Sequence, residues 1–150
     1  MNGWLLDTNV IFEITRRNGD ARVLRWMTGQ PEHSFHISVL TLGEYDKGIH
    51  NLPTGSLLRM RTEADLRALE SRFARRVLPV SDPIVRRWGR LSGEIQRTTG
   101  RAPAVVDTLL AATAIEHGLV LATRNVRDVQ DTGARLFNPW QDDPESLSSA

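Results

Sequence analysis

The stretch GWLLDTNVIFEI (residues 3–14) places an aspartate directly behind an apolar triplet. Residues 4–6 are typical of a short buried strand, and the apolar residues between 10 and 14 indicate the element that follows it. Asp7 or Thr8 could simply cap a helix at this junction, because the first N–H groups of every helix need acceptors. The alternative is that Asp7 is a functional carboxylate at a strand end.

The composition is that of one ordinary globular domain. The chain has 150 residues, of which 40% are hydrophobic and 25% charged, and this length is sufficient to bury a core. Because it has no cysteine, neither a disulfide nor a thiolate zinc site is possible. Apolar runs are shorter than a membrane span requires, and no signal-peptide pattern begins the sequence. We therefore expect a cytoplasmic protein with no membrane segment.

The net charge of +1 hides an uneven distribution of charge. Residues 59–101 contain eleven arginines and five acidic residues, whereas residues 102–150 contain three arginines and seven acidic residues. Lys47 is the only lysine. Arginine suits phosphate recognition, so a basic segment beside carboxylates fits a protein that holds a polyanion. A solvated, arginine-rich helix surface would give the same pattern without any such function.

Short strand-like segments alternate with helical patterns along the chain. Strands are expected at residues 4–6, 35–39, 77–81 and 119–123 and within 134–140. Helices are expected from a cap at Asp20 to about Gly29, over 42–52, over 56–76, from Asp82 to about 95, and from about Ala104 to Gly118. This alternation is typical of an α/β domain with a helix-covered parallel sheet. We assign residues 1–140 to a single domain and 141–150 to a polar C-terminal tail.

Four carboxylates occupy unusual places in this pattern. Asp7 ends the first strand, Glu44 lies in the expected first turn of the helix after the second strand, and Asp128 follows the fourth strand. Ligands of such sheets bind beyond these strand ends. Asp107 lies in a helix that is apolar nearly all round and should be largely buried. A buried ionised carboxylate is costly without an arginine or a metal as partner.

Each carboxylate also has a structural explanation. Glu44 has the spacing of a capping box with Thr41, Asp107 suits a first helical turn or an ion pair with arginine, and aspartates such as Asp128 are common in loops. Taken together, converging carboxylates are a typical site for Mg²⁺ or Mn²⁺, and the four histidines show no ligand spacing. Such a metal can activate water for hydrolysis of a phosphodiester.

Four segments in this order resemble a known family. They are LLDTNV (5–10), SVLTLGEYDKGI (38–49), VVDTLLAATAIEHGLVLATRNVRDV (105–129) and LFNPW (136–140). The chain resembles PIN-domain proteins, specifically the VapC-like toxins of type II toxin–antitoxin modules and their FitB-like branch. The resemblance extends from Leu5 to about Trp140.

The resemblance implies a fold and an activity. The fold is α/β, with a PIN-like parallel sheet of about five short strands layered between helices. The implied site contains Asp7, Glu44, Asp107 and a fourth acid near Thr123, and it binds magnesium or manganese. The implied activity is that of an endoribonuclease toxin acting on tRNA or other structured RNA. A homodimer is implied too, as is a small VapB/FitA-like antitoxin that itself binds DNA.

One position departs from part of the family. Some FitB-like members have aspartate where this chain has Asn125, whereas many VapC-like members have the pattern that Asp128 satisfies. We therefore assign Asp128 as the fourth acid and Asn125 as an orienting or water-mediated contact. Thr8, Asn9 and Thr123 are expected to support the site through hydroxyl or amide groups. Asp7 is then a metal ligand, and Thr8 is left to cap the helix.

Three other classes of function remain to be weighed. A receiver-like phospho-acceptor needs a lysine near its aspartates, and Lys47 is badly placed for this role. An aspartyl phosphatase needs a second aspartate two residues after the first, where this chain has Asn9. The third class is a non-catalytic regulatory protein that acts on operator DNA through its antitoxin complex. Metal-dependent cleavage by the isolated chain would separate this class from the nuclease.

Overall fold

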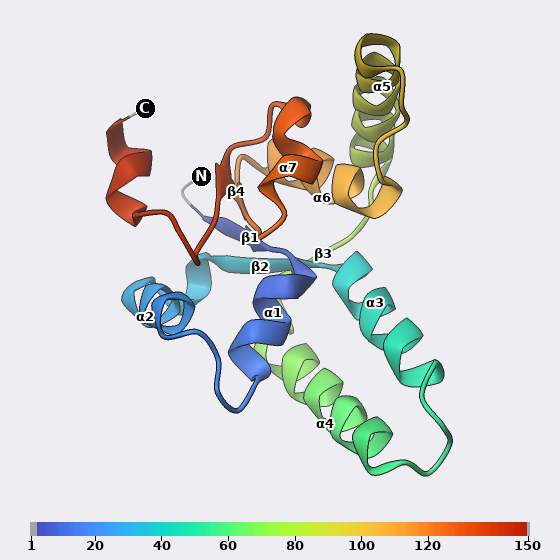
Figure 1. The fold of residues 1–150 in the computed structure, drawn as a ribbon, viewed down its shortest axis with the longest axis vertical. Coiled ribbons are helices and arrows are strands. Elements are labelled where there is room, and N and C mark those ends of the chain that lie inside the picture. The colour runs from blue at the N-terminus through green and yellow to red at the C-terminus, as the bar shows by residue number, and fades with distance from the viewer. Residues whose placement is uncertain (1–2, 150) are drawn as a thin grey trace.

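Five short parallel strands form a single sheet at the centre of the molecule. The computed structural model describes residues 3–149 of the chain (Figure 1). The strands are β1 (Trp4–Leu6), β2 (Phe35–Ser38), β3 (Val77–Leu78), β4 (Val120–Ala122) and β5 (Leu136–Phe137). Their order is β3-β2-β1-β4-β5, and every pairing is parallel. The predicted parallel α/β sheet of about five strands is confirmed.

The central strand β1 marks the point at which the chain changes direction across the sheet. Trp4 lies opposite Phe35 of β2 on one side and Val120 of β4 on the other. Strands β2 and β3 lie on one side of β1, and strands β4 and β5 lie on its other side. Parallel sheets of this kind open a crevice beyond the carboxyl ends of the strands at such a switch point. Asp7 directly follows β1 at this place.

Within residues 3–149, seven helices cover the two faces of the sheet. They are α1 (Thr8–Thr15), α2 (Ala21–Gly29), α3 (Val39–His50), α4 (Leu57–Arg72), α5 (Asp82–Thr99), α6 (Val105–His117) and α7 (Val126–Val129). Short 3₁₀ helices span Glu32–Ser34, Gln130–Thr132 and Pro144–Ser149. Figure 1 shows α1 to α4 on one side of the sheet and α5 to α7 on the other, with α3 and α4 extending outward as a hairpin. None of the helices within residues 3–149 has the length and apolarity to cross a bilayer.

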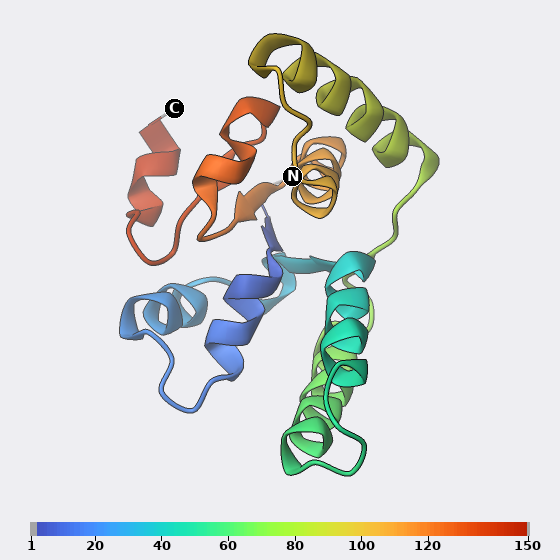
Figure 2. The same ribbon diagram turned by 45° about the vertical axis from the view of Figure 1, so that its right-hand side comes forward.

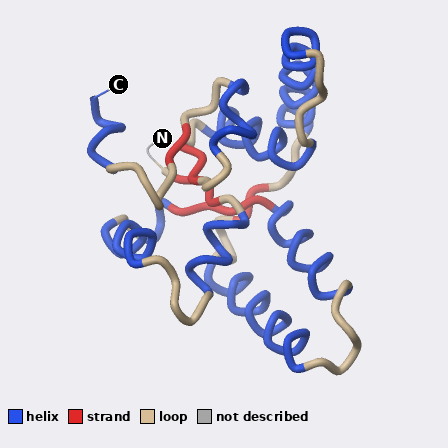
Figure 3. The backbone as a smooth tube through the Cα atoms, in the orientation of Figure 1, coloured by secondary structure: helices blue, strands red, loops and turns tan. Residues whose placement is uncertain are grey.

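The alternation of side chains along β1 explains these two layers. Trp4 and Leu6 belong to the core beneath α1 and α2, whereas Leu5 packs with Leu110 and Leu121 on the α6 side. Successive strand side chains point to opposite faces, so a strand of three apolar residues requires cover on both sides. The strands therefore sit in the middle of the molecule, enclosed by helices (Figure 3).

Several boundaries differ from the sequence prediction: the strands expected at 77–81 and 119–123 are shorter, and the helix expected to end near 95 runs to Thr99. Local contacts decide two further boundaries. The expected strand 35–39 ends at Ser38, whose hydroxyl accepts a hydrogen bond from the Leu40 N–H at 3.0 Å and starts α3 there. Val39 therefore lies on the helix and is 42% exposed. The long helix expected over 56–76 ends at Arg72, because Phe73 is fully buried and turns the chain into the core.

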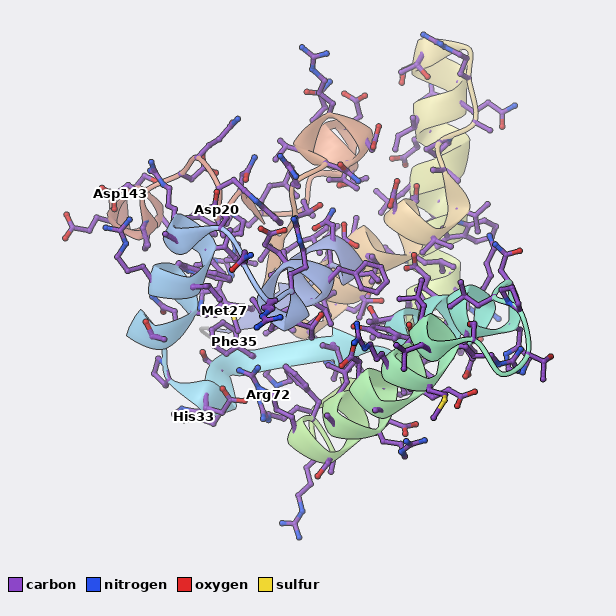
Figure 4. The ribbon with its side chains drawn as sticks, turned by 60° about the horizontal axis from the view of Figure 1, so that its bottom comes forward. Asp20, Met27, His33, Phe35, Arg72 and Asp143 are labelled. Atoms are coloured by element: carbon purple, nitrogen blue, oxygen red, sulfur yellow. The ribbon has the colours of Figure 1, made fainter. Side chains whose placement is uncertain are left out.

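Arginine side chains hold two segments beside the core: the start of β2 and the C-terminal segment. Arg72 donates two hydrogen bonds to the Glu32 carboxylate at 2.8 and 2.9 Å, beside the start of β2 near His33 and Phe35 (Figure 4). Together with Arg76 it lowers the pKa of Glu32 to about 2. The C-terminal segment lies against α2, since Arg22 donates to the backbone carbonyls of residues 141 and 142.

Candidate metal centre

Asp7 is both the cap of α1 and the most enclosed carboxylate of the site. It is 8% exposed and directly follows β1. Its Oδ1 accepts a hydrogen bond from the Thr8 N–H at 2.6 Å. The expectation that Thr8 caps the helix is therefore wrong, because Asp7 occupies the N-cap position and Thr8 is the first helical residue. A cap and a functional carboxylate are not exclusive, since the second oxygen of Asp7 faces other partners.

That second oxygen is held by the loop after β4. Asp7 Oδ2 accepts hydrogen bonds from Thr123 Oγ1 at 2.7 Å and from Asn9 Nδ2 at 3.2 Å. Asn9 Oδ1 in turn accepts from the Arg124 N–H at 3.3 Å, and Thr123 Oγ1 accepts from the Asn125 N–H at 3.0 Å. These contacts fix the start of α1 against the segment 123–125. Thr123 and Asn9 thus hold Asp7 in one orientation, while the Asn125 contribution is through its backbone.

Glu44 reaches the same place from α3. Thr8 Oγ1 donates to Glu44 Oε1 at 2.9 Å and lies 3.0 Å from Thr41 Oγ1. Because α3 begins at Val39, Glu44 lies in the second turn rather than the first, and Ser38 caps the helix instead of a Thr41–Glu44 box. Thr41 is fully buried and was not among the predicted site residues. Its spacing three residues before Glu44 was the only signal in the sequence, and that signal pointed to a cap.

Asp107 lies in the first turn of α6, where the sequence placed it. It is only half-buried, in contrast to the expected burial. The first turn of α6 lies at the surface, where Val105 and Val106 are also 55% and 38% exposed. Within residues 3–149 its carboxylate receives no hydrogen bond and no ion pair. Burial raises its pKa, and the charges of Asp7 and Asp128 raise the pKa further.

Asp128 completes the group from the short helix α7. It is exposed and lies on a helical turn rather than in a loop, with Asn125 at the N-cap position of that turn. Its negative charge acts on Asp107, just as that of Glu44 acts on Asp7. The structure therefore brings all four predicted carboxylates to one edge of the sheet, where their charges repel.

The four carboxylates share one further property. Each of the six ion pairs found within residues 3–149 involves other acidic side chains, although the chain has eighteen arginines. The alternative that Asp107 is held by arginine is thereby excluded for the described residues. Repelling oxygen donors without a cation are unfavourable, which is the condition that a hard divalent ion relieves.

The donor chemistry of the site, rather than its spacing, fits a hard divalent ion. Across residues 3–149, no three acidic or histidine side chains approach closely enough to enclose a metal directly. Mg²⁺ commonly keeps several waters and uses only one or two carboxylates. The carboxylate donors are thus of the kind that a divalent ion with several bound waters uses.

This chain matches a known domain family over most of its length. The sequence profile of the PIN domain matches residues 4–133. The chain belongs to the PIN domain family. The resemblance stated from the sequence is thereby confirmed, and the five-stranded sheet with its covering helices is the fold of this PIN domain.

Relatives of this PIN domain match more than nine tenths of its length. Toxin FitB of Neisseria gonorrhoeae is 33% identical over 141 residues, covering 92% of this chain and 99% of FitB. VapC ribonuclease Y4jK of Sinorhizobium fredii is 33% identical over 140 residues, covering 91% of this chain and 97% of the relative. A solved structure of FitAB bound to an IR36 DNA fragment superposes with a TM-score of 0.82 at 29% identity, covering 93% of this chain and 97% of that chain.

Replacing Thr123 by valine tests how Asp7 is held in this PIN domain. Valine has nearly the same shape but cannot donate to Oδ2, so the charged form of Asp7 loses a stabilising hydrogen bond. We expect the pKa of Asp7, already raised by burial, to rise further. Carboxyl titration by NMR in metal-free buffer measures this. The matched change Thr62→Val, in a partly buried helical threonine of α4 that bonds only a backbone carbonyl, should leave the pKa of Asp7 unchanged.

Proposed function

We propose that this PIN domain is a metal-dependent endoribonuclease and the toxin of a type II toxin–antitoxin module. The observation that carries the proposal is the set of four mutually repelling carboxylates without arginine partners at the carboxyl edge of the sheet. A relative that is matched over 97% of its length is named a VapC ribonuclease, and another is named Toxin FitB. Both names support this activity for a chain that shares their whole fold.

The proposed roles of the residues follow from how each is held. Asp7 and Asp107 anchor Mg²⁺ or Mn²⁺, directly or through water, and Glu44 and Asp128 complete the shell. When bound, the ion lowers the pKa of water and offsets negative charge on the scissile phosphate. Thr8 fixes Glu44 by a hydrogen bond, and we assign to Glu44 or Asp128 the role of orienting the attacking water.

The basic segment supplies candidates for RNA binding. Arg59, Arg72, Arg76, Arg86 and Arg87 form ion pairs within the described chain. The six arginines of residues 59–101 that form none are Arg61, Arg67, Arg75, Arg90, Arg97 and Arg101. These six are exposed and remain available to phosphates. RNA affinity should therefore fall steeply with salt, and tRNA or another structured RNA is the proposed substrate.

The proposed partner is a small DNA-binding antitoxin of the VapB/FitA type. Two structural relatives are such complexes: FitAB bound to a DNA fragment and DNA-bound VapBC from Salmonella typhimurium. The VapBC structure has a TM-score of 0.74 and 26% identity, and the match covers 93% of this chain and 99% of that chain. We extend to this chain the same kind of complex, a homodimeric arrangement and a cytoplasmic location. These DNA-bound relatives also favour a second candidate function, in which the chain regulates an operator through its antitoxin without cleaving RNA.

Cleavage of total RNA by the purified chain separates the two functions. We expect discrete fragments with Mg²⁺ or Mn²⁺, none in EDTA, and none from Asp7→Asn. The matched control Asp65→Asn changes an exposed aspartate of α4 that forms no ion pair and should cleave like the parent. A folded, antitoxin-free chain that cleaves nothing with any metal would favour the regulatory function instead.

A further inference from the structure

A polar pocket adjoins the acidic site through Asp128. It has a volume of about 640 Å³ and lies between residues 124–128 and the turn 138–142, with Asp128 in its wall. This volume lies within the range of about 300–1,000 Å³ typical of small-molecule sites. The pocket is thus large enough for one unit of a polymer whose neighbouring unit occupies the metal centre.

Arg124 is fixed at the mouth of this pocket in an unusual way. Its guanidinium lies over the Trp140 ring, 5.0 Å from the ring centroid, and within residues 3–149 it pairs with no acid. Its backbone N–H donates to Asn9 Oδ1, and the preceding residue, Thr123, donates to Asp7. A guanidinium stacked on an aromatic face keeps the N–H donors along its edge free for a phosphate. The backbone of Arg124 is therefore held beside the carboxylates, and stacking on Trp140 fixes the direction of its guanidinium.

The surface that carries Trp140 is itself rigid. Asn138 Oδ1 accepts from the Trp140 N–H at 2.9 Å, and Asp142 Oδ2 accepts from the Asn138 N–H at 2.7 Å. Arg22 of α2 holds the backbone of residues 141 and 142, and one side of Trp140 packs against the main core. Such a wall keeps the guanidinium in place with little loss of side-chain entropy on binding.

We propose that Arg124 binds the RNA phosphate next to the scissile one, and that Trp140 is the positioning residue that presents it. This inference rests on the proposed ribonuclease function, and it adds a subsite that the metal site alone does not provide. The pocket carries two arginines, Arg124 and Arg127, beside Asp128 and Asp142. With the charge of Asp128 directed to a metal ion, the charges that remain at the pocket are those of Arg124, Arg127 and Asp142. Their sum is positive and favours an anion.

Steady-state cleavage of a defined RNA by Arg124→Ala tests the subsite. We expect KM to rise about tenfold, the loss typical of one charge-assisted contact, with kcat changed by less than about twofold. The slope of log KM against log salt should decrease by about 0.7, the contribution of one phosphate contact on a single strand. The control Arg17→Ala removes an exposed arginine beyond the far end of α1 from Asp7 and should change neither quantity.

Two Trp140 variants test the positioning role. Trp140→Phe keeps an aromatic face and should keep KM within about twofold, whereas Trp140→Leu should raise KM nearly as far as Arg124→Ala. The double variant Arg124→Ala/Trp140→Leu should be no worse than Arg124→Ala alone, because the two residues act as a unit. Thermal denaturation of each variant identifies any loss of folding. A smaller folded fraction reduces the amount of active protein but leaves the slope of log KM against log salt unchanged.

The outcomes distinguish the subsite from the function on which it rests. If the parent chain cleaves RNA and Arg124→Ala behaves like Arg17→Ala, the subsite is wrong and the ribonuclease stands. A fall in kcat at constant KM would place Arg124 at the reacting centre and would also overturn a flanking subsite. If the folded parent chain cleaves no RNA, the proposed function fails and this subsite fails with it.

Discussion

Asp107→Asn is expected to abolish RNA cleavage and at the same time to make the metal-free protein more stable. The loss of a ligand to the ion removes about 4 kcal/mol of transition-state stabilisation, which corresponds to a rate lower by about 1,000-fold. The gain in stability arises because Asp107 is half-buried, has no partner among residues 3–149, and is repelled by Asp7 and Asp128. Asparagine keeps the shape of the side chain and removes this repulsion.

The gain in stability should depend on pH in a defined direction. The pKa of Asp107 is raised above its usual value of 3.8 in the folded chain, so the folded state binds this proton more tightly than the unfolded state. At a pH above the pKa values of both states the carboxyl is ionised in each, and the folded state bears the full cost of burial and repulsion. As the pH falls toward 3.8, the folded carboxyl takes up its proton first and the penalty disappears. The advantage of Asp107→Asn is therefore largest near neutral pH and shrinks on acidification.

Thermal denaturation in EDTA at several pH values measures this effect. We expect Tm to rise by about 2–4 °C near pH 7, the shift that about 1 kcal/mol produces in a domain of this size. Asp65→Asn serves again as the control, because its carboxylate is exposed and forms no ion pair. A variant that loses stability, or one that still cleaves RNA at the parent rate, would contradict the assignment of Asp107.

Metal removal is expected to have the second large effect, and it links activity to stability. Cleavage should stop in EDTA and return with Mg²⁺ or Mn²⁺. The proposed ion would bind the folded chain and relieve the repulsion among four carboxylates, so saturating metal should also raise Tm. A concentration one hundred times Kd adds about 2.7 kcal/mol of stability. Differential scanning calorimetry against metal concentration measures this gain.

The same titration on two variants locates the ion. Asp7→Asn and Asp107→Asn should each lose most of the metal-dependent rise in Tm, whereas Asp65→Asn should keep it. If the parent chain gains no stability from either metal, the carboxylates do not form a metal site. If the variants gain as much as the parent, the ion binds elsewhere.

The sequence was sufficient to predict the fold class and the neighbourhood of the four carboxylates. The apolar triplet before Asp7 and the run before Thr123 predicted adjacent strands, and parallel pairing of β1 with β4 places their carboxyl ends side by side. The residues that decided the boundaries were harder to identify, because Ser38 caps α3 through a contact that competes with the strand pattern of Phe35, Ile37 and Val39.

Burial and helix capping were the features that the sequence predicted least well. The apolar sequence around Asp107 indicated a buried helix, but the first turn of α6 extends beyond the core and leaves Val105 exposed. Whether an apolar side chain is covered depends on its neighbours in space, which periodicity alone does not specify. Similarly, the hydroxyl of Thr8 had two possible uses, and only the position of α3 directs it to Glu44 rather than to the backbone.

The position of β1 in the middle of the sheet also affects when the site can form during synthesis. Figure 2 shows the start of α1 in the interior, between the helices of the N-terminal and C-terminal parts of the chain. Asp7 leaves the ribosome first, but Thr123, which orients it, follows 116 residues later. A nascent chain that ends before β4 lacks the central pairing, the hydroxyl donor and Asp128. The acidic centre can therefore form only after β4 and α7 have been synthesised, and chains truncated before β4 should be inert.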